Sequence, residues 1–162
     1  MVVEGDGEEA LCLHLKERSR SSGTRIVVRN AHGGSPRSII EHARDLLKPV
    51  AYDSLIVLLD NDVPLRPSDH RLWEKIRLPK GGDKLLLFSE PCLEAEALRL
   101  LGSAAPYETG TCQRHLDKLG YTKQSLGDRR SWSKIIGPLD LTAARCRSTW
   151  LDTLMKAMRI PV

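Results

Sequence analysis

The stretch LIVLLDNDVP, residues 55–64, decides how this chain is interpreted. Five apolar residues run directly into Asp60 and Asp62, with Asn61 between the two acids and Pro64 close behind. A run that is apolar at every position is typical of a central strand in a parallel sheet, because helices cover both of its faces. Functional side chains gather at the carboxyl ends of such strands. The two aspartates are therefore candidates for a metal site, an aspartyl-phosphatase site or a phosphoacceptor site.

The segments around this strand alternate between strand and helix patterns over the first 90 residues. Strands are predicted at MVV (1–3), TRIVVRN (24–30), SLIVLLDND (54–62) and KLLLF (84–88). A helix is predicted at 8–19, and another begins at Ser35, a good N-cap followed by Pro36, and ends before Pro49. Ser68 is expected to cap a short helix that carries Leu72, Trp73 and Ile76. This alternation predicts a parallel sheet covered by helices.

The last 70 residues show only helical spacing. Helices are predicted on the face formed by Leu93, Ala97, Leu98 and Leu101, near 111–119, and in a long closing helix with Leu151, Leu154, Met155 and Met158. The segment YTKQSLGDRR (121–130) is interpreted as a polar stretch between them. We therefore expect an α/β core over residues 1–102, with a helical C-terminal extension over 103–162 packed on it.

Composition excludes several classes of protein. The apolar content of 41% and charged content of 28% are ordinary for a globular domain, and no run of 18 apolar residues predicts a membrane span. The four cysteines are dispersed and form no CxxC pair, which argues against a zinc site. Together with an acidic start unlike a signal peptide, they favour a cytoplasmic location. The net charge of +4 permits a nucleic-acid partner. With only 4% aromatic residues, phosphate contacts would carry such binding.

A second acidic group follows the first predicted strand. Glu4 comes directly after MVV, and Gly5 and Gly7 precede a helix N-terminus, where backbone N–H groups can receive a phosphate. Oxygen ligands of this kind suit Mg²⁺ or Mn²⁺, and such an ion can activate water for attack on a phosphate ester. The ordinary alternative is that Asp60 begins a turn and that EGDGEE only caps a helix. The presence of both groups, each at a strand end, favours a metal site.

Four stretches of the chain, taken in order, resemble the Toprim domain, and within it the RloB-like branch related to OLD-family nucleases. They are VVEGDGEE, GGSPRSIIEHA, YDSLIVLLDND and SEPCLEAEALRLLG. The resemblance covers roughly residues 1–137. It implies a Toprim-like (Rossmann-like), mostly parallel four-stranded sheet flanked by helices. In that family a glutamate followed by glycine and a later DxD gather around Mg²⁺; here these are Glu4 with Gly5, and Asp60 with Asp62.

The resemblance also implies roles for further residues. Glu8 or Glu9 matches an additional acid of the family, with Glu8 preferred, and Glu94 would complete the metal site or bind a second ion. Ser89 would lie near the site, and Lys123, in GYTKQSLGD, would contact phosphate. The implied activity is a metal-dependent endonuclease acting on DNA or on tRNA or other RNA, in defence against phage or foreign DNA, often with a partner ATPase. A homo-oligomer stays open, and so does a segment upstream of the first motif.

Three other interpretations remain. LLDNDVP fits the DxDx(T/V) pattern of haloacid-dehalogenase-type phosphatases, in which Asp60 would be the nucleophile. The same strand is similar to the phosphoacceptor strand of receiver domains, but neither class finds its remaining motifs in this chain. A Toprim-shaped subunit that is non-catalytic or depends on a partner is the third.

Three residues outside the acid groups are further candidates for substrate binding. His32, in the AHGG turn, would lie beside the carboxyl edge of the sheet and could contact substrate or carry a proton. Arg129 and Arg130 flank Trp132 and follow Lys123, so they could form a strip that contacts phosphate. Their ordinary alternative is a solvated helix face with one anchored aromatic ring.

Overall fold

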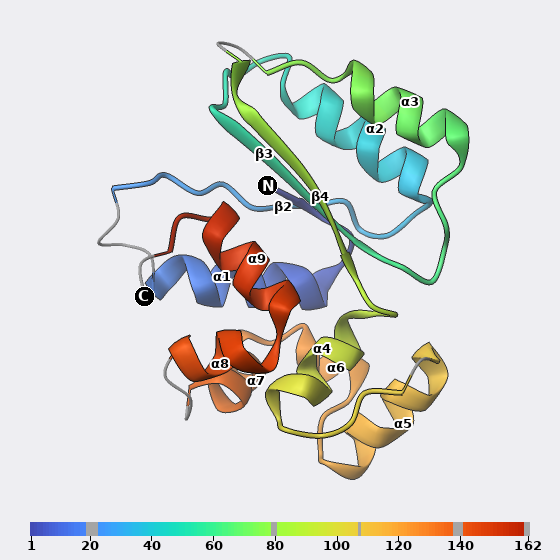
Figure 1. The fold of residues 1–162 in the computed structure, drawn as a ribbon, viewed down its shortest axis with the longest axis vertical. Coiled ribbons are helices and arrows are strands. Elements are labelled where there is room, and N and C mark those ends of the chain that lie inside the picture. Colours follow the sequence, from blue (N-terminus) through green and yellow to red (C-terminus); the bar gives the residue numbers. More distant parts are fainter. Residues whose placement is uncertain (19–22, 79–80, 107, 138–140, 161–162) are drawn as a thin grey trace.

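The computed structural model describes residues 1–18, 23–78, 81–106, 108–137 and 141–160. Within them, four strands form one sheet in the order β2-β1-β3-β4, and every neighbouring pair is parallel. The strands are β1 (Val2–Val3), β2 (Arg29–Asn30), β3 (Ser54–Asp60) and β4 (Asp83–Ser89). Figure 1 shows helices on both sides of this sheet. The predicted α/β class with a helix-covered parallel sheet is confirmed.

One face of the sheet is covered by α2 (Pro36–Leu46) and α3 (Pro67–Lys75) (Figure 1). Successive strand residues point to opposite faces, so Leu55, Val57 and Leu59 all reach this side. They form one hydrophobic cluster with Ile39 and Ile40 of α2. Ile56 and Leu58 belong to the larger cluster on the other face. The continuous apolar run of β3 is therefore explained by burial on both sides.

The other face is covered by the remaining helices (Figure 1). These are α1 (Asp6–Arg18), α4 (Leu93–Leu100), α5 (Thr109–Lys118), α6 (Lys123–Leu126), α7 (Arg129–Ile136), α8 (Leu141–Arg147) and α9 (Thr149–Ala157). Helices α6 and α7 pack on α1, and α9 packs on β4. Trp132 is fully buried among them and donates its indole N–H to the Leu126 carbonyl, 2.8 Å away. No helix of the described residues carries an apolar run long enough to cross a bilayer.

Three predicted strands are longer than the observed ones, and for the first of them the difference is Met1 alone. The run at 24–30 forms a strand only at Arg29–Asn30, because its neighbour β1 supplies just two paired residues, Val2 and Val3. The strand predicted to reach 62 ends at Asp60, and Asn61 and Asp62 lie in a turn. A residue joins a strand only where a neighbouring strand is in register with it.

Three helix predictions are also wrong in detail. The N-cap of α3 is Arg66 rather than Ser68, because Pro67 occupies the first turn and Asp69 accepts the Arg66 N–H at 2.9 Å. The long closing helix is divided into α8 and α9, since Ser148 accepts the Leu151 N–H and starts a new helix there. The polar stretch 121–130 contains α6 and the start of α7.

Candidate functional site

The carboxyl ends of three strands meet at one edge of the sheet. Register pairs Val3 with Leu58 and Asp60 with Ser89, so the residues that follow β1 and end β3 and β4 are neighbours. The Asp60 backbone N–H donates to Glu4 Oε2 at 3.0 Å, which joins the two predicted acid groups directly. Acids separated by 56 residues in the chain are therefore adjacent in space.

Backbone donors hold one oxygen of each of three carboxylates. Besides the Glu4 contact, the Gly5 N–H donates to Glu8 Oε2 at 3.2 Å, and the Leu93 N–H donates to Asp60 Oδ1 at 3.0 Å. These bonds tie the start of α1 and the start of α4 to the end of β3. Because a carboxylate has two oxygens with several lone pairs, each of these acids keeps acceptor capacity for another ligand.

Glu8 is the buried acid of this group. Its side chain lies in the first turn of α1 and is 5% exposed. Burial raises the pKa of Glu8 to about 7, and the nearby Glu4 and Glu94 carboxylates contribute to the rise. Glu9, the other acid considered for this role, instead accepts a hydrogen bond from the Asn30 amide at 3.2 Å. Of the two, Glu8 lies among the other acids.

Asp60 is the acid most affected by its neighbours. Burial raises the pKa of Asp60 to about 8, and the carboxylates of Glu8, Glu4, Glu94 and Asp62 contribute to the rise. Burial also raises the pKa of Glu4, with a further rise from Asp62 and an opposing effect of the Lys123 ammonium. At neutral pH the group therefore retains protons that a bound cation would displace. We call Glu4, Glu8, Asp60, Asp62 and Glu94 the acid cluster.

Ser89 and Glu94 bring polar groups from the β4–α4 connection to the same place. Ser89 is fully buried, and its hydroxyl has no hydrogen-bond partner within the described residues. It is in register with Asp60, so both side chains project from the same face of the sheet. Glu94, in the first turn of α4, is 5% exposed. An unpartnered buried hydroxyl near buried carboxylates leaves a hydrogen-bonding group available to a polar ligand.

Lys123, Gly5 and the turn that carries His32 each have one link to the acid cluster. Lys123 begins α6, close enough to Glu4 to lower the pKa of that acid. His32 follows β2 with a positive φ of 58°, and the next residue, Gly33, donates its N–H to the Glu4 carbonyl at 2.7 Å. A Cβ on Gly5 would lie 3.4 Å from Glu8 Oε2, an ordinary van der Waals distance, so the hydrogen bond between the Gly5 N–H and Glu8 does not itself require glycine.

The two arginines are placed differently from the other candidates. The Arg129 guanidinium pairs with Glu17, near the C-terminal end of α1 and away from its first turn. Its helix also borders a hollow of about 340 Å³ that reaches Asp6 and Glu9. Arg130 is exposed, and its backbone N–H donates to Asp128 Oδ1 at 2.9 Å. Neither guanidinium is joined to the acid cluster by any hydrogen bond or ion pair among the described residues.

Sequence reasoning missed Asn30. Its amide donates to Asp6 Oδ1 at 2.7 Å and to Glu9 Oε2 at 3.2 Å, and its Oδ1 accepts the His32 N–H at 2.7 Å. Asn30 therefore ties the end of β2 to the first turn of α1, which carries Glu8. The sequence feature that could have indicated Asn30 is its position: it is a polar residue at the end of a β-branched run, at the carboxyl edge of the sheet where the acids lie.

The donor chemistry of the cluster suits a hard divalent cation, since carboxylate and hydroxyl oxygens are the ligands that Mg²⁺ and Mn²⁺ prefer. Among the described residues, however, no three His, Cys, Asp or Glu side chains converge closely enough to hold a metal ion. The acids are near enough to one another to raise the pKa of Glu4, Glu8 and Asp60, but metal binding would require their oxygens to turn towards one point.

Comparison with protein-family models, with curated proteins and with solved structures gave no match to this chain.

Proposed function

We propose that this chain is a metal-dependent phosphodiesterase of nucleic acid, a Toprim-type endonuclease. The observation that carries the proposal is the acid cluster itself. Two short motifs separated by more than fifty residues meet at the carboxyl edge of a parallel sheet, and the Asp60 N–H donates to Glu4. A parallel sheet places its chemistry at this edge. Toprim is the family that the motif order VVEG and LLDND resembles.

Glu4, Asp60 and Asp62 are the residues that would hold Mg²⁺ or Mn²⁺, with Glu94 and Glu8 available to complete the set. When bound, the ion would supply charge neutralisation of phosphate oxygens and a stronger nucleophile from water. The raised pKa values of Glu8, about 7, and Asp60, about 8, support this assignment. Buried acids that repel one another gain from a bound cation because it relieves that repulsion.

The chain's own groups around the cluster have separate tasks. Lys123, beside Glu4, would stabilise the extra charge that develops on a phosphate during cleavage. Ser89 offers a buried hydroxyl as a donor or acceptor. Glu8, in a site where it does not hold the ion, could give its proton to the leaving oxygen, since its pKa of about 7 lies near the pH of the cell. His32, in the turn after β2, would contact the nucleic-acid backbone.

The biological setting follows from the resemblance alone. RloB-like proteins and their OLD-family relatives imply defence against phage or foreign DNA, with a partner ATPase, and the proposal extends to that role. The positive net charge of +4 supports a polyanionic substrate, DNA or RNA.

One observation favours a second candidate, a Toprim-type subunit that is active only with a partner. No three acidic side chains converge among the described residues, so a partner or substrate that orders the carboxylates would complete the site. The two candidates differ in one measurable respect: only the first predicts tight cation binding and cleavage by the chain alone.

The proposal is tested by cation binding and cleavage measured on the same samples. We would titrate wild type, Asp60→Asn and Glu4→Gln with Mg²⁺ and Mn²⁺ by calorimetry at neutral pH. Each titration is repeated in two buffers of different ionisation enthalpy, because the difference in heat reports the protons released on binding. The same proteins are incubated with plasmid, linear duplex, single-stranded DNA and total tRNA, with each ion and with EDTA. Glu74→Gln, an exposed acid of α3, is the matched control.

We expect the wild type and Glu74→Gln to bind the ion with proton release and to cut one class of substrate. Asp60→Asn and Glu4→Gln should lose both properties. Cation binding without cleavage would favour the partner-dependent subunit. Cleavage that persists in EDTA, or in both acid variants, would place the chemistry elsewhere and refute the proposal.

A further inference from the structure

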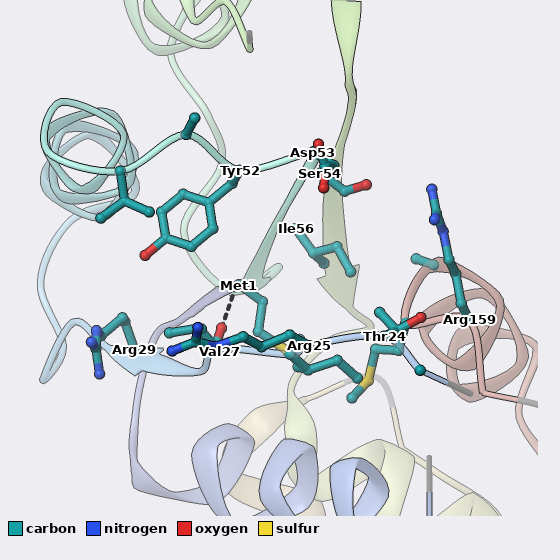
Figure 2. A pocket seen from close by; sticks show the side chains of 16 residues that line it. Met1, Thr24, Arg25, Val27, Arg29, Tyr52, Asp53, Ser54, Ile56 and Arg159 are labelled. Carbon is teal, nitrogen blue, oxygen red and sulfur yellow. Dashed lines mark hydrogen bonds between the residues drawn. The ribbon is translucent and has the colours of Figure 1, made fainter. Parts of the chain in front are cut away.

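β4 is the end strand of the sheet, and no strand of the described residues covers its outer edge. The order β2-β1-β3-β4 gives β4 one neighbour, β3, and the two pair along all seven residues, Asp83–Ser89. Figure 1 shows β4 in front of β3, with α9 on one side of it and α2 and α3 on the other. The pocket of about 720 Å³ in Figure 2 does not reach this edge, because Ser54 and Ile56 of β3 line it and no residue of β4 does.

The sequence of β4 is typical of a central strand rather than an edge strand. Residues 85–88 are apolar at four consecutive positions, as the residues of β3 are. Leu85 and Leu87 pack on the hydrophobic cluster of one face, and Leu86 and Phe88 on the cluster of the other. All four remain partly exposed, whereas the apolar residues of β3 are buried. A further strand beside β4 would cover them, so the pattern indicates that β4 is an interior strand of a larger sheet.

The backbone groups of three β4 residues point away from β3. The Ser89 carbonyl accepts the Asn61 N–H at 3.1 Å, so Ser89 directs its backbone groups towards the β3 side. Because successive strand residues direct these groups to opposite edges, Lys84, Leu86 and Phe88 direct theirs outward. None of these outward N–H and C=O groups has a hydrogen-bond partner among the described residues. They form a row of donors and acceptors with which another strand can pair.

β4 lacks most of the features that keep an edge strand from pairing. It contains no proline, and its residue-by-residue register with β3 leaves no bulge. Its one lysine is held within its own subunit at the end of α3. The Lys84 ammonium donates to the carbonyls of Trp73 and Ile76, at 2.6 and 3.1 Å, and lies 5.1 Å from the centre of the Trp73 ring. Lys84 therefore caps α3 and does not guard the edge against a second strand.

We propose that β4 pairs with β4 of a second copy of this chain, antiparallel and centred on Leu86, and so joins two four-stranded sheets into one. Directly opposite residues of an antiparallel pair exchange both of their backbone hydrogen bonds. With Leu86 opposite Leu86, and Lys84 opposite Phe88, every outward N–H and C=O of both copies has a partner. A centre on Leu85 or Leu87 would instead place Phe88 or Lys84, respectively, opposite a residue outside the strand.

The side chains also match in this register, which favours a second copy over a strand of unrelated sequence. Leu85 lies opposite Leu87 of the second copy on one face, and the two Leu86 side chains lie opposite each other on the other face. The two charged residues at the start of β4 lie opposite uncharged residues at its end, so no charge meets its like. Both β4 strands become interior strands at once, as their apolar pattern indicates.

The pairing leaves the acid cluster free. Asp60 and Ser89 mark the carboxyl edge of the sheet, and the two β4 strands run in opposite directions. The two acid clusters therefore lie at opposite ends of the interface. The dimer is independent of the proposed cleavage activity, so the failure of one proposal does not decide the other.

The first measurement is sedimentation velocity of the full chain from about 1 to about 500 µM, where we expect a monomer–dimer equilibrium with a Kd of about 1–100 µM, typical of a small interface. Leu86→Pro removes an outward N–H and leaves the ladder with β3 intact, because proline is tolerated where the N–H of an edge strand faces solvent. It should raise the Kd at least about ten-fold. Leu86→Val, which keeps the N–H, is the matched control and should change the Kd less than about three-fold. Fluorescence of the buried Trp132 shows whether each variant is folded.

Hydrogen exchange resolved by residue, followed by NMR, tests the edge without any substitution. The Leu85 and Leu87 amides face β3 and should be protected at every protein concentration. The Lys84, Leu86 and Phe88 amides should exchange quickly in dilute protein and slowly at concentrations where the dimer forms. Protection of all three is specific to the centre on Leu86, since any other centre leaves one of them unpaired.

Three results would overturn the proposal. The first is a chain that stays monomeric at about 500 µM. The second is a dimer whose Kd is unchanged by Leu86→Pro, because the interface would then lie elsewhere. The third is protection of the outward amides in the monomer, because another segment of the same chain would then cover the edge.

Discussion

Replacing Glu8 by glutamine should stabilise the metal-free protein at mildly alkaline pH. The glutamine keeps the shape of the side chain and an oxygen that can accept the Gly5 N–H, but it carries no charge. In the folded wild type the Glu8 carboxyl is 5% exposed, and burial together with Glu4 and Glu94 raises its pKa from 4.5 to about 7. Ionising Glu8 above that pKa therefore costs free energy that the unfolded chain does not incur.

The size of the effect follows from the difference between the two pKa values. A rise from 4.5 to about 7 is about 2.5 pH units, and each unit corresponds to about 1.4 kcal/mol. Below pH 4.5 both states are protonated, so Glu8 contributes nothing to the pH dependence. As pH rises towards about 7 the unfolded chain loses its proton first, and stability falls. At about pH 8 the full penalty, about 3 kcal/mol, is present and Glu8→Gln removes it.

The assay is urea denaturation in EDTA at several pH values from about 5 to about 8.5, followed by tryptophan fluorescence. Trp132 and Trp150 are buried and will report unfolding of the helical side of the core. The difference in the free energy of unfolding between Glu8→Gln and wild type should be small at about pH 5 and approach about 3 kcal/mol at about pH 8. Glu74→Gln, at an exposed position, should show no such trend.

The same experiment with about 10 mM Mg²⁺, enough to exceed a millimolar Kd, links stability to the proposed function. A bound cation should restore the wild type at about pH 8 and reduce the advantage of the variant. Two results would contradict this reasoning. One is a wild-type stability that does not change between about pH 5 and 8 in EDTA, and the other is a variant that is equally destabilised at every pH. Either would show that folding does not raise the pKa of Glu8.

Three further predictions concern single residues. Lys123→Ala should lower any cleavage about 10²–10³-fold while leaving the calorimetric affinity for Mg²⁺ nearly unchanged, and Lys118→Ala should do neither. Ser148→Ala should lower the free energy of unfolding in urea by about 2–3 kcal/mol, because the Ser148 hydroxyl caps α9 and donates to the buried Glu96 at 2.8 Å. Ser35→Ala, at the exposed N-cap of α2, should lower it by about 1 kcal/mol. Gly82→Ala should lower the thermal midpoint of unfolding, since a Cβ there would lie 2.1 Å from the Asp53 carbonyl oxygen. Gly110→Ala, in α5 and with open space around it, should raise the thermal midpoint, because alanine stabilises that helix by about 0.5–1 kcal/mol.

The parts of the fold that could be predicted from the sequence are those with strong local patterns. β3 was evident because a continuous apolar run that ends in DND is typical of a buried strand, and α2 was evident from Ser35, Pro36 and its apolar spacing. The ends of strands depended on their neighbours instead. The run at 24–30 has strand composition throughout, yet only Arg29 and Asn30 have a paired strand beside them.

The candidate site divides in the same way. That Glu4 and Asp60 meet could be predicted, because parallel strands align their carboxyl ends. The hydrogen bond from the Asp60 N–H to Glu4, the burial of Glu8 and the ties made by Asn30 depend on side-chain packing that no local pattern contains. The ion pair between Arg129 and Glu17 likewise depends on how α7 packs against α1, and that packing cannot be predicted from a local sequence pattern.

The position of β1 in the middle of the sheet also determines the order in which the strands can pair during folding. Val2 of β1 pairs with Val57 of β3, from 2 to 57 a separation of 55 residues. Contacts between distant residues form late, because a long loop must close before they are gained. β3 and β4, in register along seven residues each, can pair before β1 arrives. In a pulsed hydrogen-exchange experiment during refolding, we therefore expect the amides of Val2 and Val3 to be protected after those of β3, so that the strand in the middle of the sheet is the last to be fixed in place.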